Sequence, residues 1–176
     1  KVLKTESSAK EFRSAKKFTE TELKNLAAVP YHIISPANNQ SIVGIFQDSL
    51  LGTYQFTRQN ISFTKKETMN LLMNSKNIDA NIFKTNNISN FEILSQIMPP
   101  LSLHYKTKLY DENDDFETTN NVLEVKDGEV IRGHIEKGVL GAGSKGLLHR
   151  ICNDFGNMTA SNFIDDLQNI VTEYMK

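Results

Sequence analysis

The dipeptide Asp127-Gly128 constrains the fold of this chain more than any other short feature. It joins two apolar runs, Val122–Val125 and Val130–Ile135, and an Asp-Gly pair between such runs is the strongest short-range signal for an antiparallel hairpin. A third run, over residues 101–106, alternates apolar and polar side chains with the period of a half-buried strand. The sequence therefore predicts a small antiparallel or mixed sheet around this hairpin.

Helical signals occur on both sides of this sheet. Two capping boxes, Thr19 with Glu22 and Thr64 with Glu67, predict helices over about residues 20–28 and after residue 64. Further helices are expected over 47–57, over 91–97 with Asn90 as N-cap, and in two C-terminal patterns over 147–155 and 163–174. The expected class is α+β, with several short helices packing against the sheet.

Other segments carry weaker signals. Gly52 within the helix over 47–57 costs about 1 kcal/mol relative to alanine, which indicates close packing at that point. The segments 31–35 and 42–45 are β-rich and predict two short strands. The Asn-rich run over 74–90 has no sustained period and is expected to be a loop.

Composition limits the functional classes. The 176 residues carry 20 Lys and Arg against 21 Asp and Glu, a formal charge of −1, so the chain lacks the basic excess of a stand-alone nucleic-acid-binding protein. A single cysteine, Cys152, excludes an internal disulfide framework. The apolar runs are far shorter than the roughly 20 residues that cross a bilayer.

The first 18 residues differ from the rest. Residues 1–17 carry six basic groups against two acids, which predicts a solvated basic arm. We assign residues 1–18 to this arm and give it no role. Because the chain opens with Lys1 rather than Met, we expect it to be a piece of a longer protein.

The glycine-rich segment Gly141–Gly146 matches the dinucleotide fingerprint G-x-G-x-x-G, and Asp165 follows about 20 residues later. The fingerprint needs a buried parallel strand directly before it, whereas Glu136-Lys137-Gly138 interrupts the strand here. The phosphate-binding loop motif also fails, because Ser144-Lys145 reverses the required order. We interpret this segment as a flexible strand-to-helix loop.

Metal and nucleophile motifs are incomplete. Asp111, Asn113 and Asp115 match the start of a calcium-binding loop, but the required glycine and the final glutamate are missing, which favours a solvated acidic loop. His149 and Cys152 have helical i, i+3 spacing without a second ligand pair. The candidate serines and the histidines show no nucleophile-and-base pattern: they are Ser35, Ser41, Ser49, Ser144, His32, His104, His134 and His149. We therefore predict no catalytic and no metal-binding residue in this chain.

Several ordered stretches resemble one known family. They are Leu26–Pro36, Asn38–Gly52 with Gln47-Asp48, Thr57-Arg58, Asn90–Pro99, Asp127–Gly133, Glu136-Lys137 and Gly146–His149. In order and spacing they are similar to the largest subunit of multisubunit DNA-directed RNA polymerases, the equivalent of bacterial beta-prime, in its eukaryotic and large-DNA-virus branch. The resemblance extends from about Thr19 to Tyr174.

The resemblance implies a domain organisation and a role. Residues 19–40 would end the active-site domain, and residues 41–176 would form the pore domain, domain 3 of that subunit. In that family the matching region lines the secondary channel, through which nucleotides enter and backtracked RNA leaves. Lys137 matches a lysine that faces the pore, and Gln47, Asp48 and Arg58 match further family positions. These four residues are therefore our candidates for contact with nucleotides or RNA in the channel. A cation such as Lys137 in a narrow channel would attract phosphates.

The resemblance also implies cofactors and partners. The family's Asn-Ala-Asp-Phe-Asp-Gly-Asp run, whose carboxylates hold the catalytic Mg²⁺, is not in this chain, so we expect no cofactor here and Mg²⁺ only in the whole enzyme. The implied partners are the remaining polymerase subunits, especially the second-largest, with DNA, RNA and nucleotides, and a transcript-cleavage factor acting through the channel. No membrane partner is expected. The implied location is intracellular: nucleus or cytoplasm, or a viral factory or virion for a viral protein.

Two other hypotheses stay open at this point. The chain could be a free-standing, transcription-related interaction domain, which a reading frame continuing on both sides would exclude. It could be a nucleotide-binding enzyme that uses Gly141–Gly146, which predicts saturable binding of NAD or ATP by calorimetry.

Overall fold

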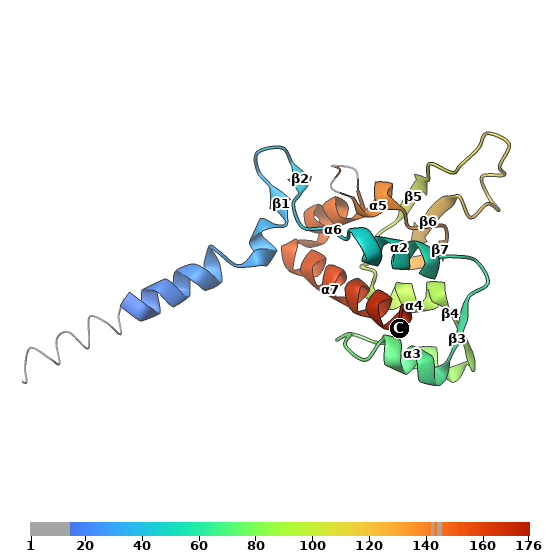
Figure 1. Cartoon of the computed structure of the whole chain (residues 1–176), viewed down its shortest axis with the longest axis horizontal. Coiled ribbons are helices and arrows are strands. Elements are labelled where there is room, and N and C mark those ends of the chain that lie inside the picture. Colours follow the sequence, from blue (N-terminus) through green and yellow to red (C-terminus); the bar gives the residue numbers. More distant parts are fainter. Residues whose placement is uncertain (1–14, 142, 144–145) are drawn as a thin grey trace, which may run out of the picture.

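The computed structural model of the protein describes residues 15–141, 143 and 146–176, which form an α+β fold (Figure 1). Its strands are β1 (Ile34–Ser35), β2 (Gln40–Ser41), β3 (Ser62–Thr64), β4 (Asn87–Ser89), β5 (Leu103–Lys106), β6 (Val122–Lys126) and β7 (Glu129–Arg132). They form two-stranded sheets β1-β2 and β3-β4 and a three-stranded sheet β5-β6-β7. Every strand pair in the described ranges is antiparallel, so the predicted fold class is confirmed.

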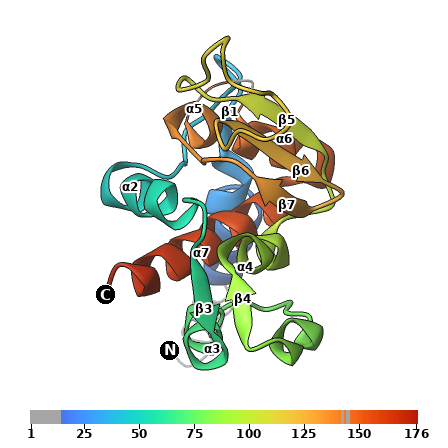
Figure 2. The same cartoon turned by 90° about the vertical axis from the view of Figure 1, so that its right-hand side faces the viewer.

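The helices lie mostly on one side of the three-stranded sheet (Figure 2). Their bounds are η1 (Val29–His32), α2 (Gln47–Phe56), α3 (Lys65–Leu71), η2 (Ala80–Lys84), α4 (Asn90–Ile97), α5 (Lys137–Leu140), α6 (Leu147–Phe155) and α7 (Asn157–Tyr174), where η marks a 3-10 helix. No helix in the described part of the chain is both long enough and apolar enough to cross a membrane.

The hairpin prediction is confirmed. Asp127 and Gly128 have φ angles of 50° and 84°, and positive φ at both central residues is what a two-residue type I′ hairpin turn requires. The turn is held from outside, because the Gly128 amide donates to the Leu101 carbonyl oxygen at 2.9 Å. Strand β7 ends at Arg132, before the end of the apolar run, and is followed by Gly133 with a φ of 111°.

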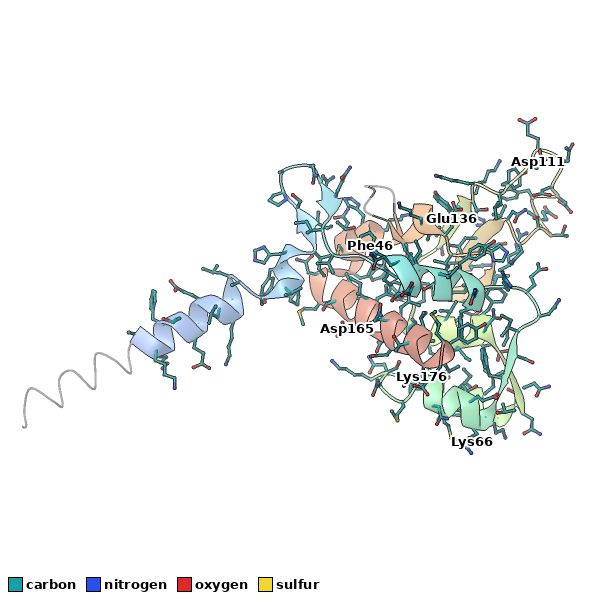
Figure 3. The ribbon with its side chains drawn as sticks, in the orientation of Figure 1. Phe46, Lys66, Asp111, Glu136, Asp165 and Lys176 are labelled. Atoms are coloured by element: carbon teal, nitrogen blue, oxygen red, sulfur yellow. The ribbon has the colours of Figure 1, made fainter. Side chains whose placement is uncertain are left out.

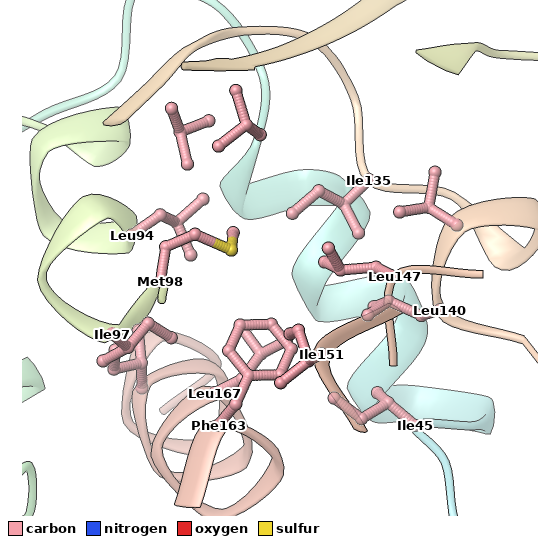
Figure 4. Close-up of a cluster of buried hydrophobic side chains, with 14 of the residues drawn as sticks. Ile45, Leu94, Ile97, Met98, Ile135, Leu140, Leu147, Ile151, Phe163 and Leu167 are labelled. Carbon is pink, nitrogen blue, oxygen red and sulfur yellow. The ribbon is translucent and has the colours of Figure 1, made fainter. Parts of the chain in front are cut away.

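Helix α7 forms the centre of the core. It contacts α2, α3, α4, α6 and η1, and it buries Ala160, Phe163, Leu167, Ile170 and Val171. Figure 4 shows Phe163 and Leu167 within the cluster that also contains Leu94 and Ile151. The close packing expected at Gly52 is confirmed, since a Cβ atom there would lie 2.5 Å from Val171 Cγ1.

One of the two predicted capping boxes is present. The Thr64 side chain accepts from the Glu67 amide, and Glu67 Oε2 accepts from the Thr64 amide at 2.8 Å. The other prediction is wrong, because residues 15–25 are continuously helical and the Thr19 hydroxyl donates to the Ala15 carbonyl oxygen at 3.0 Å. Thr19 thus lies inside a helix, which extends away from the rest of the described chain (Figure 1).

The N-cap predicted for the helix over 91–97 is also wrong. Ser89 caps α4 and forms a capping box with Glu92. Asn90 is the first helical residue, and its side chain bonds elsewhere. The cause is local chemistry, since Ser89 with Glu92 three residues later is itself a capping signature, one position before the predicted one.

Three other local predictions need correction. In 31–35 only Ile34–Ser35 is a strand, because Pro30 opens the 3-10 helix η1. Residues 42–45 are not a strand, and β1 pairs instead with Gln40–Ser41 in a very short hairpin. The run 74–90 is not all loop, because it contains η2 and β4, and β4 pairs with β3.

Candidate functional site

The four candidate residues lie around helix α2 and the segment that follows β7. That segment runs along α2 in the opposite direction. At one end the Ile135 amide donates to the Thr57 hydroxyl at 3.1 Å, and at the other end the Leu140 carbonyl oxygen lies against Gly44. Lys137 lies between these two contacts along the chain.

Lys137 is exposed at the first position of α5. The residues before the glycine-rich segment are not loop, because Lys137–Leu140 makes one helical turn. Residues 142 and 144–145 lie outside the described residues. Tyr105 of β5 packs beside this turn, since a Cβ atom on Gly138 would lie 2.5 Å from the Tyr105 hydroxyl oxygen. Glu136, labelled in Figure 3, lies before the turn. Its Oε1 accepts from the Lys108 amide at 3.1 Å.

Gln47 and Asp48 form the first turn of α2 and are both exposed. Gln47 has a φ of 52°, which is uncommon for a residue other than glycine. Phe46 provides no side-chain cap, so the carboxylate of Asp48 is the acidic group at this end, where it interacts favourably with the helix dipole. This structural role accounts for Asp48 without a ligand.

Arg58 is exposed and lies just beyond the other end of α2. Because an α-helix rises 1.5 Å per residue, Arg58 is about 15 Å from Asp48 along the axis. The structure thus places Gln47 and Asp48 at one end of α2 and Arg58 beyond the other, with Lys137 in α5 on the segment that follows β7. The four residues do not converge on one point.

Buried polar groups fix the end of α2 at Arg58. Asn90, with 1% of its surface exposed, donates through its amide nitrogen to the carbonyl oxygens of Phe56 at 2.6 Å and Arg58 at 2.8 Å. The hydroxyl of Thr57 is bonded to the Thr53 carbonyl oxygen and also accepts from the Ile135 amide. The backbone on both sides of Arg58 is therefore held by α4 and by the segment that leads to Lys137.

His134 lies where the end of α2 near Arg58 meets the segment that follows β7, a place we call the junction. Its ring packs on Tyr54 of α2 with centroids 4.9 Å apart. Asn120 Oδ1 accepts from the Gly133 amide at 2.9 Å, so Asn120 Nδ2 is the group that donates to His134 Nε2 at 3.0 Å. Burial lowers the pKa of His134 below its ordinary value, and the positive charge of Arg58 lowers that pKa further, while the backbone of Thr57 opposes the shift.

Sequence reasoning missed Asn90, Asn120 and His134 as parts of this junction. Thr57 was among the matched family positions, but no pattern indicated its partner. The bonded pairs are separated by 34 residues for Asn90 and Phe56 and by 78 for Thr57 and Ile135. No local signal could have found them.

The acidic loop that begins like a calcium-binding loop has a structural role. Asp114 Oδ2 accepts from Asn121 Nδ2 at 2.7 Å and from the Asp111 amide, and these bonds hold the pKa of Asp114 below its usual range. Asp115 accepts from the Glu117 amide and the Thr118 hydroxyl. The carboxylates thus stabilise turns within their own loop.

The pair of His149 and Cys152 does not converge on a common point. His149 Nε2 donates to Asn39 Oδ1 and its Nδ1 accepts from Asn153 Nδ2, both at 3.1 Å. Cys152 is buried, and burial raises the pKa of its thiol. Within the described ranges, no three His, Cys, Asp or Glu side chains gather as metal ligands would.

Comparison with known proteins gives a consistent result. The family model described as RNA polymerase Rpb1, domain 3, matches residues 32–176. The chain is 28% identical over 158 residues to the DNA-directed RNA polymerase subunit 1 of Acanthamoeba polyphaga mimivirus, which covers 89% of this chain and 10% of that relative.

Two proteins of Trypanosoma brucei brucei are also similar. They are named DNA-directed RNA polymerase II subunit RPB1-A and RPB1-B, and each is 27% identical over 161 residues, covering 89% of this chain and 9% of the relative. The chain therefore spans about a tenth of the length of the curated relatives it matches.

Proposed function

The chain belongs to the family described as RNA polymerase Rpb1, domain 3, and on this basis we propose that it is part of a DNA-directed RNA polymerase and lines the pore for nucleotides and backtracked RNA. The observation that carries the proposal is the family match over residues 32–176. In this proposal residues 19–40 end the active-site domain, and residues 41–176 form the pore domain.

The proposed pore surface is the stretch around α2 and α5. Lys137 is exposed and does not belong to an ion pair among the described residues. A free cation on a channel wall attracts the phosphates of nucleotides and of RNA, and the attraction is stronger in a confined site than in open water. Arg58 would act in the same way at the far end of α2, with Gln47 and Asp48 contributing polar contacts.

Replacing Lys137 with alanine tests this role. In a polymerase that contains this segment, we expect the KM for nucleotides to rise about fivefold, because one partly hydrated phosphate contact is worth about 1 kcal/mol. The change in kcat should be smaller than the change in KM, since Lys137 would act before the chemical step. Steady-state transcription assays at several nucleotide concentrations measure both quantities.

The matched controls are Lys137→Arg, which keeps the charge, and Lys126→Ala, which removes an exposed lysine at the end of β6. Both should leave the KM within twofold of the unchanged enzyme, a difference of about 0.4 kcal/mol. If Lys126→Ala raises the KM as much as Lys137→Ala, the effect is general electrostatics and the pore role of Lys137 is wrong.

The chain is proposed to contribute no catalyst of its own. Phosphoryl transfer in such enzymes uses Mg²⁺ held by clustered carboxylates, which we propose are supplied by other parts of the enzyme. We expect no primer extension when the 176-residue chain is incubated with template, nucleotides and Mg²⁺. Extension by the chain alone, retained after purification in high salt, would contradict the proposal.

Exposed apolar side chains support a role inside a larger assembly. Phe18 and Leu23 on the projecting N-terminal helix, and Leu26 in the turn that follows it, are 60–69% exposed. Apolar groups gathered on a surface mark contacts with other proteins. We propose that the remaining polymerase subunits, the second-largest above all, cover such surfaces, with a transcript-cleavage factor reaching the pore. An intracellular location is part of the same proposal.

A free-standing interaction domain remains the second candidate, because the same exposed groups would suit an adaptor. Mass spectrometry of the native protein distinguishes the two. Peptides of this chain within a polypeptide more than a thousand residues long would support the polymerase segment, and a stable product near 20 kDa would support the adaptor.

A further inference from the structure

The junction at the end of α2 contains one side chain that cannot accept a proton without losing its contacts. His134 Nε2 accepts a hydrogen bond from Asn120 Nδ2, so the neutral ring must carry its proton on Nδ1. Nδ1 is buried without a completed hydrogen bond, although the backbone of Thr57 is near enough to favour a proton there. Adding a second proton would point an N–H at Nε2 directly toward another N–H donor.

Asn120 cannot relieve this conflict by turning its amide over. Its Oδ1 accepts from the Gly133 backbone amide, which fixes the orientation of the group. The backbone carbonyl oxygen of Asn120 also accepts from the backbone amide of His134 at 3.1 Å. A flipped amide would accept from the protonated ring but would place an NH₂ group against Gly133, so one hydrogen bond is lost in either arrangement.

The charges around the His134 ring also disfavour its protonation. The ring faces Tyr54 of α2 and the positive charge of Arg58, which lies just beyond the end of α2. From the loop before β6 it faces the neutral Asn120, and on β7 the nearest cation, Arg132, is bound to Glu124 with Nε and Oε2 2.8 Å apart. The aromatic face of Tyr54 and the backbone of Thr57 would favour an imidazolium, whereas burial and the charge of Arg58 disfavour it and lower the pKa of His134.

We propose that His134 is a proton-operated latch between the end of α2 and the segment that leads into α5. In the neutral state the ring holds residues 133–135 against Asn120 and Tyr54. In the protonated state the ring leaves this site and loses its contacts with Tyr54 and Asn120 Nδ2. The backbone amides of Gly133 and His134 keep their bonds to Asn120, and the Ile135 amide keeps its bond to the Thr57 hydroxyl. The segment that leads to Lys137 then has one fewer contact with α2, because the packing of His134 on Tyr54 is lost. The latch goes beyond the proposed pore function and does not depend on it.

The direction of the pH effect follows from the lowered pKa. An unfolded chain binds this proton near pH 6.5, whereas the folded chain binds it only at lower pH. The stabilising contribution of neutral His134 is therefore complete above about pH 6.5 and is lost as the pH falls through the folded-state pKa.

Nuclear magnetic resonance of the labelled 176-residue chain tests the latch. We expect the His134 ring nitrogens to titrate with a midpoint below about 6.5, the value of an unstructured peptide. The amides of Gly133 and Ile135 should shift with the same midpoint. A midpoint at or above that value, or amides that do not respond, overturns the proposal.

Two variants and one control separate the latch from general acid effects. Asn120→Asp lets one carboxylate accept from both the Gly133 amide and a protonated Nε2, so the midpoint should rise by about one unit or more. His134→Gln keeps an acceptor for Asn120 without a titrating ring, so the acid-linked amide shifts should vanish. His104→Gln, which changes an exposed histidine, should leave those shifts in place.

The resonance titration can fail while the pore proposal holds, and the reverse, because the pore proposal is tested separately by the polymerase assays. If Asn120→Asp does not fold, His134→Gln still decides. Amide shifts at Gly133 and Ile135 that persist in His134→Gln would show that another group causes them, and the latch would be refuted.

Discussion

Replacing Gly133 with alanine is expected to prevent the chain from folding. Gly133 has a φ of 111°, and a Cβ atom there would lie 2.5 Å from the Val122 carbonyl oxygen and 2.6 Å from the Leu123 backbone nitrogen. Both atoms belong to the backbone of β6, which cannot move without disrupting the sheet. We expect a loss of at least about 4 kcal/mol, because the clash adds to the cost of a positive φ. Urea unfolding followed by circular dichroism measures it.

Gly156→Ala is the matched control for this substitution. Gly156 also has a positive φ, 86°, but a Cβ atom there meets nothing within 4 Å. Its replacement should therefore cost only the backbone strain of this conformation, about 1–3 kcal/mol. Equal losses for the two variants would show that the contact of Gly133 with β6 is unimportant.

The second large effect is expected at Asn90. Aspartate has the same shape as asparagine, but it cannot donate to the carbonyl oxygens of Phe56 and Arg58, and it places a buried negative charge against both of them. A buried charge without a partner costs about 3–5 kcal/mol. Asn90→Ala removes the donors without adding charge, so it should cost less, about 1–3 kcal/mol. The free energy of unfolding at pH 7, from urea titrations, compares the two.

The Asn90→Asp variant should also acquire a distinctive pH dependence. Burial would raise the pKa of the new carboxyl in the folded chain, so the folded state would bind more protons than the unfolded state above about pH 4. The variant should then regain stability as the pH falls toward that value. Asn87→Asp, at an exposed position of β4, should change the stability by less than about 0.5 kcal/mol. If Asn90→Asp is as stable as Asn87→Asp, the junction at Arg58 is not held as described.

Local chemistry explains which elements could be predicted from the sequence. The turn at Asp127-Gly128 and the cap at Thr64 depend on residues within three positions of each other, and both are present. The cap predicted at Thr19 failed because the same Thr-x-x-Glu spacing also fits inside a helix. The cap predicted at Asn90 failed because Ser89 and Glu92 form a capping box one position earlier. The actual partners of the Asn90 amide lie more than 30 positions earlier in the chain, which no local pattern reveals.

In the candidate site, too, some residues could be indicated from the sequence and others could not. Similarity to a known family indicated Lys137, Arg58, Gln47 and Asp48, and these remain proposals with testable roles. The groups that hold Arg58 and the segment before Lys137 in place could not be inferred. His134 looks isolated in the sequence, and its partners Tyr54 and Asn120 come from different elements of the fold. A tertiary junction of this kind becomes visible only when the elements are in place.

The position of α7 has a consequence for the order of folding during synthesis. The helix is the last element of the described chain, yet α2, α3, α4 and α6 all bury side chains against it. Until its residues have emerged from the ribosome, these earlier helices have no partner for their apolar faces. The hairpin of β6 and β7 can form early because its contacts are local, whereas closure of the core must wait. A ribosome stalled before residue 157 should therefore present an open, protease-sensitive chain that a chaperone can bind.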